Sequence, residues 1–297
     1  MKYIITGSLG HISNPIVTAL VKEGHNVTVI SSNKTKAGEI ESLGAKAAIG
    51  SITDRSFVTN TFKGADVVYL MIPPNFAAPD FRAYQHEVAD NYTAAIKQNN
   101  IQRVVLLSSI GAHLRKGAGP IDGLAYLEEQ LLSLNINAKF LRPGYFYYNI
   151  YHMAGMLKHA GFIGGNFGTP EEKLVLVHHL DIAAKAIEHL KNPSFTGYSV
   201  DYIVSDERYA SDIATVIGNS VGKPGAQWVT FTDQQALDGM LQQGINADLA
   251  ENYKDMGKAF REGHIQEDYW KNKPAQPGSH KLEDFAKEFA AVYAQQP

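Results

Sequence analysis

The chain has 297 residues and a formal net charge of -3; 44% of its residues are hydrophobic and 19% are charged. This composition supports a sizeable core and excludes disordered and fibrous classes, and the balanced charge argues against a large basic face for nucleic acid. The absence of cysteine excludes a disulfide scaffold, a thiolate zinc site, an iron–sulfur cluster and a cysteine nucleophile. No apolar run is long enough to span a membrane, and MKYIIT leads directly into a strand with no room for a signal peptide. We therefore expect a cytoplasmic protein.

The first half of the chain alternates apolar runs with helical patterns. Strand candidates lie at residues 3–5, 27–30, 47–49, 67–72, 104–107 and 138–141. Between them apolar residues recur at helical spacing, as in Ile16, Leu20 and Val21 or Val88, Tyr92 and Ile96. Strands that are apolar on both faces and alternate with helices predict a parallel sheet covered on both sides. Right-handed crossovers then give an α/β fold with a doubly wound parallel sheet.

After about residue 150 the regular alternation stops. GFIGGNFG at 161–168 predicts a loop or hairpin, LVLV at 174–177 a strand, and Asp181 the N-cap of the helix that follows. Further helices are expected over 208–221, 233–243 and 282–293, the last docking through Phe285, Phe289 and Val292. We expect one domain over 1–150, completed by about 174–192, and a smaller mixed α/β domain over 151–297.

A glycine loop follows the first strand. Gly7 and Gly10 lie three residues apart between a strand and a helix. A phosphate requires such a loop because side chains would block the backbone, and a helix N-terminus offers free N–H groups and a positive dipole end. Ser13 is small enough for the helix to pack closely on the sheet. The pattern therefore predicts a dinucleotide pyrophosphate site.

The second strand ends in Ser31, Ser32, Asn33 and Lys34. A carboxylate at this position would bind the ribose 2′-hydroxyl of NAD, and none is present. Small hydroxyls and a lysine suit a 2′-phosphate instead, so NADP(H) is favoured over NAD(H).

Five motifs resemble one family in order along the chain. They are TGSLGHIS at 6–13, GSITD at 50–54, YLMIPPN at 69–75, VVLLSSIGAH at 104–113 and FLRPGYFYYN at 140–149. Together they are similar to the NmrA-like branch of the atypical short-chain dehydrogenase/reductase superfamily. The resemblance implies a Rossmann domain that binds NADP(H) and a smaller C-terminal domain that closes a substrate cleft. Members include quinone and azo reductases and redox-sensing regulators with little or no catalysis.

The resemblance also assigns cofactor-binding positions. It places Gly7, Leu9, Gly10, His11 and Ile12 around the pyrophosphate and Ser31, Ser32, Asn33 and Lys34 at the adenosine phosphate. Relatives commonly carry an acidic residue at the adenine where this chain has Ser51, and Ile52 would pack on the ring. Ile72, Pro73 and Pro74 would line the ribose side, and the nicotinamide end would be bordered by Ser108, Ser109, Ile110, Pro143, Tyr145 and Phe146.

The proton relay of the wider superfamily is incomplete in this sequence. That relay uses Tyr-x-x-x-Lys, in which a lysine one helical turn away lowers the pKa of the phenol. Here Tyr126 is followed by Gln130. Quinone reduction depends less on a base than alcohol oxidation does, so positioning of the nicotinamide carries more of the rate. The aromatic run 145–151 suits a flat substrate, with Phe146 and Tyr148 expected in the core.

Three further candidates for chemistry remain. His113 follows the fifth strand, where a proton donor would lie, and Tyr145 and Tyr126 are the other catalytic candidates. His178 and His179 are adjacent and point to opposite faces of a strand, so we expect no metal site. The carboxylates of Glu128 and Glu129 are expected on a solvated helix surface.

Two main functions follow. The first is an NADP(H)-dependent oxidoreductase that transfers hydride to quinone-like or related small electrophiles; the second is a non-catalytic NAD(P)-sensing regulator with a protein partner. A sugar-nucleotide epimerase is a weaker alternative, because such enzymes usually need the tyrosine–lysine pair. We expect a small aromatic substrate and neither nucleic acid nor membrane as partner, and a homodimer stays open.

Overall fold

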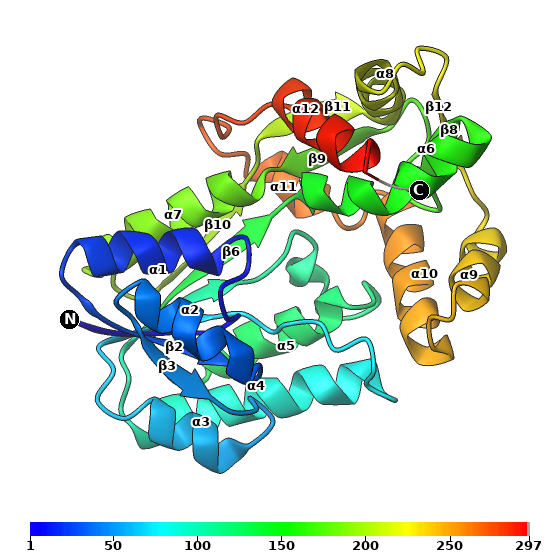
Figure 1. Cartoon of the computed structure of the whole chain (residues 1–297). Helices are drawn as coiled ribbons and strands as arrows, with labels where there is room; N and C mark the ends of the chain where they lie inside the picture. The colour runs from blue at the N-terminus through cyan, green and yellow to red at the C-terminus, as the bar shows by residue number, and fades with distance from the viewer. Residues whose placement is uncertain (296–297) are drawn as a thin grey trace. The chain divides into compact units, whose positions relative to one another are not determined.

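A computed structural model describes residues 1–295 (Figure 1). The chain divides into two compact units. The first comprises Met1–Ser109, Ile121–Arg142 and Ile182–Asp201, and the second comprises Ile110–Pro120, Pro143–Asp181 and Tyr202–Pro297. Each unit is built from segments that are distant in sequence, so the chain passes between the two several times.

A seven-stranded sheet forms the centre of the first unit. Its order is β10-β6-β5-β4-β1-β2-β3, and β1 pairs in parallel with both β2 and β4. The strands are β1 (Lys2–Ile5), β2 (Asn26–Ser31), β3 (Lys46–Ile49), β4 (Val67–Leu70), β5 (Arg103–Leu107), β6 (Asn137–Pro143) and β10 (Tyr198–Ile203). All six strands predicted in the first half are present. The order reverses between β1 and β4, as in a Rossmann sheet, so the predicted fold class is confirmed.

Helices cover both faces of this sheet, with α1 and α7 on one face and α3, α4 and α5 on the other (Figure 1). The helices are α1 (Ser13–Lys22), α2 (Ala37–Ser42), α3 (Arg55–Thr61), α4 (Phe81–Gln98), α5 (Ile121–Leu132) and α7 (His179–Lys191). The predicted apolar face of α4, Val88, Tyr92 and Ile96, is fully buried against β4 and β5 residues such as Leu70 and Leu106. Burial on both sides explains why these strands are continuous apolar runs.

The second unit contains two small sheets. One has the order β11-β9-β7 and the other pairs β12 with β8. The strands are β7 (Tyr145–Phe146), β8 (Phe162–Gly165), β9 (Lys173–Val177), β11 (Asp206–Tyr209) and β12 (Gln227–Thr230). The helices are α6 (Ala154–Ala160), α8 (Ala210–Ser220), α9 (Asp233–Gln242), α10 (Ala247–Arg261), α11 (Glu267–Lys271) and α12 (Leu282–Tyr293). The helices predicted over 208–221, 233–243 and 282–293 are confirmed.

The expectations for the GFIGGNFG segment and for the docking face of α12 are wrong. The GFIGGNFG segment contains strand β8, because its glycines allow β12 to approach closely: a Cβ on Gly164 would lie 1.9 Å from the Val229 carbonyl oxygen. On α12, Phe285 and Phe289 are buried as expected, but Val292 is 38% exposed. The docking face of α12 is therefore narrower than its apolar pattern suggested.

Across residues 1–295, every helix is too short or too polar to serve as a membrane-spanning segment.

Candidate functional site

Four chain segments gather at one edge of the large sheet. Because β1, β2, β4 and β5 run parallel, the residues after each strand emerge at the same edge. These segments are 6–13, 31–34, 71–74 and 108–109. Ligands of doubly wound folds bind at this edge, beside the point where the strand order reverses.

The glycine loop is tied to the sheet at its base. The Thr6 hydroxyl accepts a hydrogen bond from the Met71 N–H at 2.8 Å, and the Ser13 hydroxyl donates to the Thr6 carbonyl at 3.1 Å. Gly7 has a φ of +89°, and a Cβ there would lie 2.7 Å from the Met71 Sδ. Gly7 is therefore required by the tight turn itself.

Gly10 meets a different constraint. It is exposed, and a Cβ there would meet only the Gly7 carbonyl oxygen, at 3.4 Å. Leu9 and Ile12 are half-buried beside it, and His11 is exposed. Helix α1 starts at Ser13 without a side-chain hydrogen bond at its N-cap, Ile12. The first-turn N–H groups thus lie behind a loop in which Gly10 carries no side chain, an arrangement that suits a phosphate.

The predicted adenosine side follows β2 and β3. Ser31 is buried and accepts a hydrogen bond from Ser8 at 3.0 Å, which joins this strand end to the glycine loop. Ser32, Asn33 and Lys34 are exposed. After β3, Ser51 is exposed, and Ile52 is half-buried against the core that contains Val88 and Leu70.

Lysine charges beside β2 differ in their partners. Lys36 forms an ion pair with Glu39 at 2.6 Å. Among residues 1–295, no acidic side chain pairs with Lys34. Lys34 thus has a charge available for an anionic ligand.

The segment after β4 is held by tyrosines from α4. The Tyr92 hydroxyl donates to the Met71 carbonyl at 3.1 Å, and the Tyr84 hydroxyl donates to the Pro73 carbonyl at 2.9 Å. Ile72 is buried and Pro74 is exposed. These bonds hold the predicted ribose-side residues beside the glycine loop, which Thr6 ties to the same segment.

A buried ionic network stands behind β5. Glu128 of α5 is only 5% exposed and forms two hydrogen bonds with Arg142 of β6, at 3.0 Å and 2.6 Å. Ser108, directly after β5, donates to the same carboxylate at 2.5 Å. The expectation of a solvated Glu128 is wrong. Glu128 lies three residues after Ala125 and three before Leu131, so it is on the buried face of the helix. This spacing, together with Arg142 inside an apolar strand, indicates a buried ion pair.

Tyr126 of α5 faces helix α4 and not the Ser108 network. Its hydroxyl donates to Asp90 of α4 at 2.8 Å, and its ring stacks on His86 with centroids 4.1 Å apart. Burial and the hydrogen bond to Asp90 raise the pKa of Tyr126 above its ordinary value of 10. Because residues 126 and 128 lie about 200° apart around a helix, the structure does not bring Tyr126 to Ser108.

The predicted nicotinamide-end residues from 110 onward belong to the second unit. The Ile110 N–H donates to the Pro143 carbonyl at 2.9 Å, which joins the chain after β5 to the end of β6. A Cβ on Gly144 would lie 2.5 Å from the Val175 carbonyl oxygen, so β7 and β9 require glycine here. His113 is half-buried in the short 3₁₀ turn Ala112–Leu114.

The buried and exposed side chains of the aromatic run after β6 differ from those expected. Tyr147 is buried and stacks on Phe285 at 5.2 Å, whereas Tyr148 is 41% exposed. Phe146 is half-buried. The placement of Tyr148 in the core is therefore wrong, because a 3₁₀ helix replaces strand alternation from Tyr147 onward. Tyr145 packs against Phe167 at 5.0 Å, and burial raises its pKa above 10.

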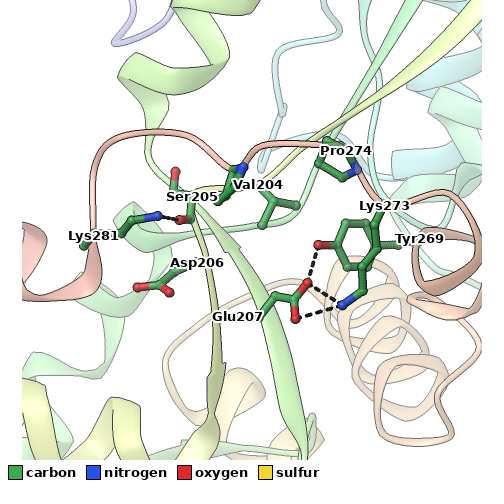
Figure 2. A pocket seen from close by; sticks show the side chains of 9 residues that line it. Val204, Ser205, Asp206, Glu207, Tyr269, Lys273, Pro274 and Lys281 are labelled. Carbon is green, nitrogen blue, oxygen red and sulfur yellow. Dashed lines mark hydrogen bonds and ion pairs between the residues drawn. The ribbon is translucent and has the colours of Figure 1, made fainter.

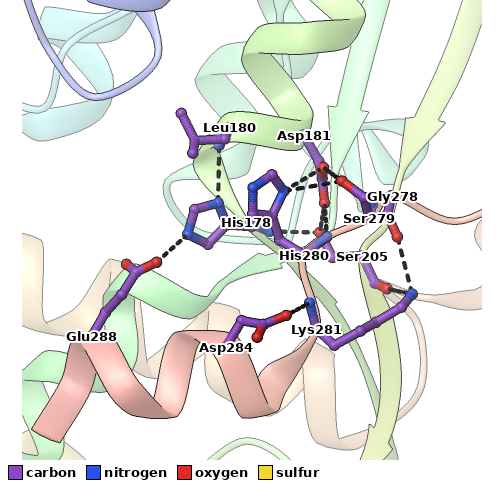
Figure 3. Close-up of polar contacts among 10 residues, drawn as sticks. All are labelled: His178, Leu180, Asp181, Ser205, Gly278, Ser279, His280, Lys281, Asp284 and Glu288. Carbon is purple, nitrogen blue, oxygen red and sulfur yellow. Dashed lines mark hydrogen bonds and ion pairs between the residues drawn. The ribbon is translucent and has the colours of Figure 1, made fainter.

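Asp181 anchors a second polar network rather than capping a helix (Figure 3). Helix α7 begins at His179, two residues before Asp181, so the N-cap expectation is wrong. The carboxylate of Asp181 instead accepts hydrogen bonds from Ser205 at 2.5 Å and from the ring of His280 at 2.8 Å. A Cβ on Gly278 would lie 2.2 Å from Asp181, so the segment before α12 passes directly over this carboxylate.

His178 lies inside this network (Figure 3). Its backbone N–H donates to Ser205 at 2.8 Å, and its Nδ1 accepts from the Leu180 N–H at 3.2 Å. The ring is stacked on His280 at 4.5 Å, and its Nε2 is 3.3 Å from Glu288. Burial, and then the neighbouring His280, hold the pKa of His178 below its ordinary value of 6.5.

The stability of the protein should therefore depend on pH near neutrality. Because the pKa of His178 is lower in the folded state, the unfolded chain binds more protons there as pH falls through about 6.5, so folded-state stability is lost below that pH. Burial opposes the change at Asp181, but hydrogen bonds from Ser205 and His280 outweigh it and lower its pKa. Its contribution is lost only further into acid, below 3.8.

Urea unfolding at pH 7.5 and pH 5.5 measures the effect. His178→Asn keeps an acceptor for the Leu180 N–H but removes the titrating ring, so the variant should lose less stability between the two pH values than the unsubstituted protein. His264→Asn, at an exposed position, serves as the control and should leave the pH dependence unchanged. Equal loss in His178→Asn and the unsubstituted protein would contradict the assignment.

A pocket of about 250 Å³ lies beside this network in the second unit (Figure 2). Glu207 accepts a hydrogen bond from Tyr269 at 2.6 Å and pairs with Lys273 at 2.8 Å. Lys281 donates to the Ser205 carbonyl at 2.6 Å. Glu207 and Lys273 are thus paired with each other, whereas Lys281 is held by a backbone carbonyl.

No group of three or more histidine, aspartate or glutamate side chains in the described part of the chain has an arrangement that could hold a metal ion.

The fold and the open glycine loop define a dinucleotide-binding Rossmann protein. A family model described as NAD(P)H-binding matches residues 7–193, and the chain belongs to this family. The predicted membership of an NAD(P)H-binding family is therefore confirmed. An NAD(P)H azoreductase of Xenophilus azovorans is 21% identical over 253 residues, which cover 85% of each chain.

Solved structures show the same fold over nearly the whole chain. The NADPH-dependent quinone oxidoreductase QOR2 of Escherichia coli, complexed with NADPH, has a TM-score of 0.79 at 17% identity and covers 98% of this chain and 99% of its own. The triphenylmethane reductase of Citrobacter sp., complexed with NADP(H), has a TM-score of 0.78 at 15% identity, covering 97% and 99%. A nucleoside-diphosphate-sugar epimerase of Staphylococcus aureus has a TM-score of 0.79 at 15% identity, covering 97% and 100%.

Proposed function

We propose that this protein is an NADP(H)-dependent oxidoreductase that transfers hydride to quinone-like or related small electrophiles. The observation that carries the proposal is the open glycine loop. Gly10 leaves space where a side chain would block phosphate, while the neighbouring turn is held by Gly7 and Thr6. The azoreductase, quinone oxidoreductase and triphenylmethane reductase named above support a reductase of this type.

Binding of NADP(H) is supported by the residues at the end of β2. Lys34 is exposed and lacks an acidic partner in the described chain, and the neighbouring Ser32 and Asn33 are small and polar. A 2′-phosphate would be matched by this charge, and an unmodified ribose would lack the carboxylate partner it usually finds there. The cofactor, when bound, supplies the hydride.

The choice of an electron-poor acceptor is supported by the absence of a base of suitable pKa on α5. The phenol of Tyr126 is hydrogen-bonded to Asp90 and has a raised pKa, so it is a poor base at neutral pH. A quinone accepts hydride without prior activation, and the resulting hydroquinone anion takes its proton from water. The chain's own contribution is then to bind and orient the reactants.

Calorimetric titration with NADPH and NADH, followed by turnover against a panel of quinones and azo dyes, tests the proposal. We expect tighter binding of NADPH and cofactor oxidation that depends on the added quinone. Tight NADPH binding without oxidation across the panel would refute the reductase and leave the sensing alternative.

Lys34→Glu should weaken NADPH binding about 10- to 100-fold and change NADH affinity by less than about threefold. The substitution replaces a partner of the 2′-phosphate by a repelling charge, and each tenfold corresponds to about 1.4 kcal/mol. Lys36→Glu is the control, because Lys36 is already paired with Glu39. Fluorescence titration of both cofactors measures the ratio, and an equal loss for NADPH and NADH would contradict the role of Lys34.

A cofactor-sensing regulator is the second candidate. The observation that favours it is the engagement of Tyr126 with Asp90, which leaves α5 without the tyrosine–lysine relay. The same observation weighs against an epimerase of this fold. Pull-down with immobilised protein, loaded with NADPH or NADP⁺, should then capture a partner in only one redox state; identical captures would contradict regulation by cofactor sensing.

A further inference from the structure

The hydroxyl hydrogen of Ser108 is already committed. Ser108 is 4% exposed, and its Oγ donates to the Glu128 Oε1 at 2.5 Å. A serine hydroxyl has one hydrogen to donate and two lone pairs to accept. Once the hydrogen points at Glu128, Ser108 can offer only its lone pairs to any further group.

Glu128 is held in the accepting role. Its Oε1 also accepts from Arg142 Nε at 3.0 Å, and its Oε2 accepts from Arg142 Nη2 at 2.6 Å. A guanidinium only donates, and it stays protonated in proteins. Both carboxylate oxygens therefore accept hydrogen bonds from a fixed cation, and the carboxylate has no hydrogen to return to Ser108. The two-point contact with Arg142 also fixes the Glu128 carboxylate, so the hydrogen bond between Ser108 and Glu128 runs from the serine to the carboxylate.

Ser108 lies where the second half of a dinucleotide would extend. The glycine loop follows β1, β4 pairs with β1, and β5 pairs with β4. Two strand spacings place the end of β5 about 10 Å across the sheet from the end of β1. With the adenosine half proposed at the end of β2, on the other side of β1, the nicotinamide half extends toward β4 and β5.

We propose that Ser108 is a hydrogen-bond acceptor for the carboxamide NH₂ of bound nicotinamide, with Glu128 and Arg142 as positioning residues. This inference rests on the proposed function. A hydroxyl locked as acceptor distinguishes the nitrogen of the carboxamide from its oxygen, so it selects one orientation of that group and of the ring attached to it. The same lock excludes Ser108 as the donor of a proton to the reduced substrate.

Binding of NADP⁺ and of its 3-acetylpyridine analogue tests the inference. The analogue replaces the NH₂ by a methyl group, so it keeps the acceptor oxygen and loses the donor. We expect the unsubstituted protein to bind the analogue about tenfold more weakly, the effect of one hydrogen bond with a buried partner left unmade. The thionicotinamide analogue keeps the NH₂ and should bind close to NADP⁺.

Ser108→Ala should remove the preference. The variant is expected to lose about tenfold in NADP⁺ affinity and little in affinity for the acetylpyridine analogue, so the two converge. Because both ligands are measured on the same variant, a general loss of stability changes both affinities and leaves their ratio unaffected. In Glu128→Gln the amide NH₂ can donate to the serine, which frees the Ser108 hydrogen. This variant should also reduce the ratio of the affinity for NADP⁺ to the affinity for the acetylpyridine analogue.

The outcomes separate the two claims. If NADP⁺ binds tightly but the ratio is near one, or is the same in Ser108→Ala as in the unsubstituted protein, the inference is overturned and the proposed function stands. If the unsubstituted protein binds no NADP⁺ at all, the proposed function falls and the inference falls with it.

Discussion

Arg142→Met is expected to lower the free energy of unfolding by about 3–5 kcal/mol. The substitution leaves the Glu128 carboxylate buried at 5% exposure without its cation and keeps the apolar volume of the side chain. A buried charge without a partner retains its full desolvation cost, whereas the paired charge had two hydrogen bonds to offset it. Equilibrium unfolding in urea, with the midpoint and slope fitted together, measures the change.

Two controls accompany this measurement. Lys185→Met breaks the exposed pair between Lys185 and Glu188 of the same unit and should change stability by less than about 1 kcal/mol. The double variant Arg142→Met, Glu128→Leu removes both charges and should recover most of the loss. A loss from Arg142→Met no greater than that from Lys185→Met would mean that water reaches the Glu128 carboxylate.

Gly10→Val is expected to weaken NADPH binding by at least about 100-fold while the protein remains folded. A valine side chain would occupy the space over the first turn of α1 that the pyrophosphate needs, and the lost contacts to several N–H groups are charge-assisted. The fold itself tolerates the substitution, because a Cβ there meets only one atom, at 3.4 Å. Calorimetry measures the affinity, and thermal unfolding checks the fold.

Valine substitutions at two other glycines serve as comparisons for Gly10→Val. Gly7→Val should destabilise the protein as well as prevent binding, because Gly7 has a positive φ and its Cβ would clash with Met71 and Ser13. Gly38→Val, at a helix position with open space around it, should affect neither property. Unchanged NADPH affinity in Gly10→Val would show that the phosphates bind elsewhere.

Much of the first unit could be predicted from the sequence because its signals are local. The central strands β1, β4 and β5 are apolar on both faces, as a parallel sheet covered on both sides requires, and helical periodicity separates them along the chain. The glycine loop was recognisable because a positive φ at Gly7 and an open approach at Gly10 are demands that only glycine meets. The preference for NADP(H) and the residues assigned to its binding are also inferred from short sequence motifs, and they stay predictions.

What the sequence could not determine depends on contacts between distant segments. Glu128 was expected in solvent because its partner lies on another strand, and Arg142 meets it only when α5 packs over β5 and β6. Asp181 has the sequence position of a helix cap, yet Ser205 and His280 bind it once the segment before α12 folds back. A short polar side chain can satisfy its hydrogen bonds locally or with a distant partner at similar free energy. Tertiary packing therefore decides which of these bonds forms.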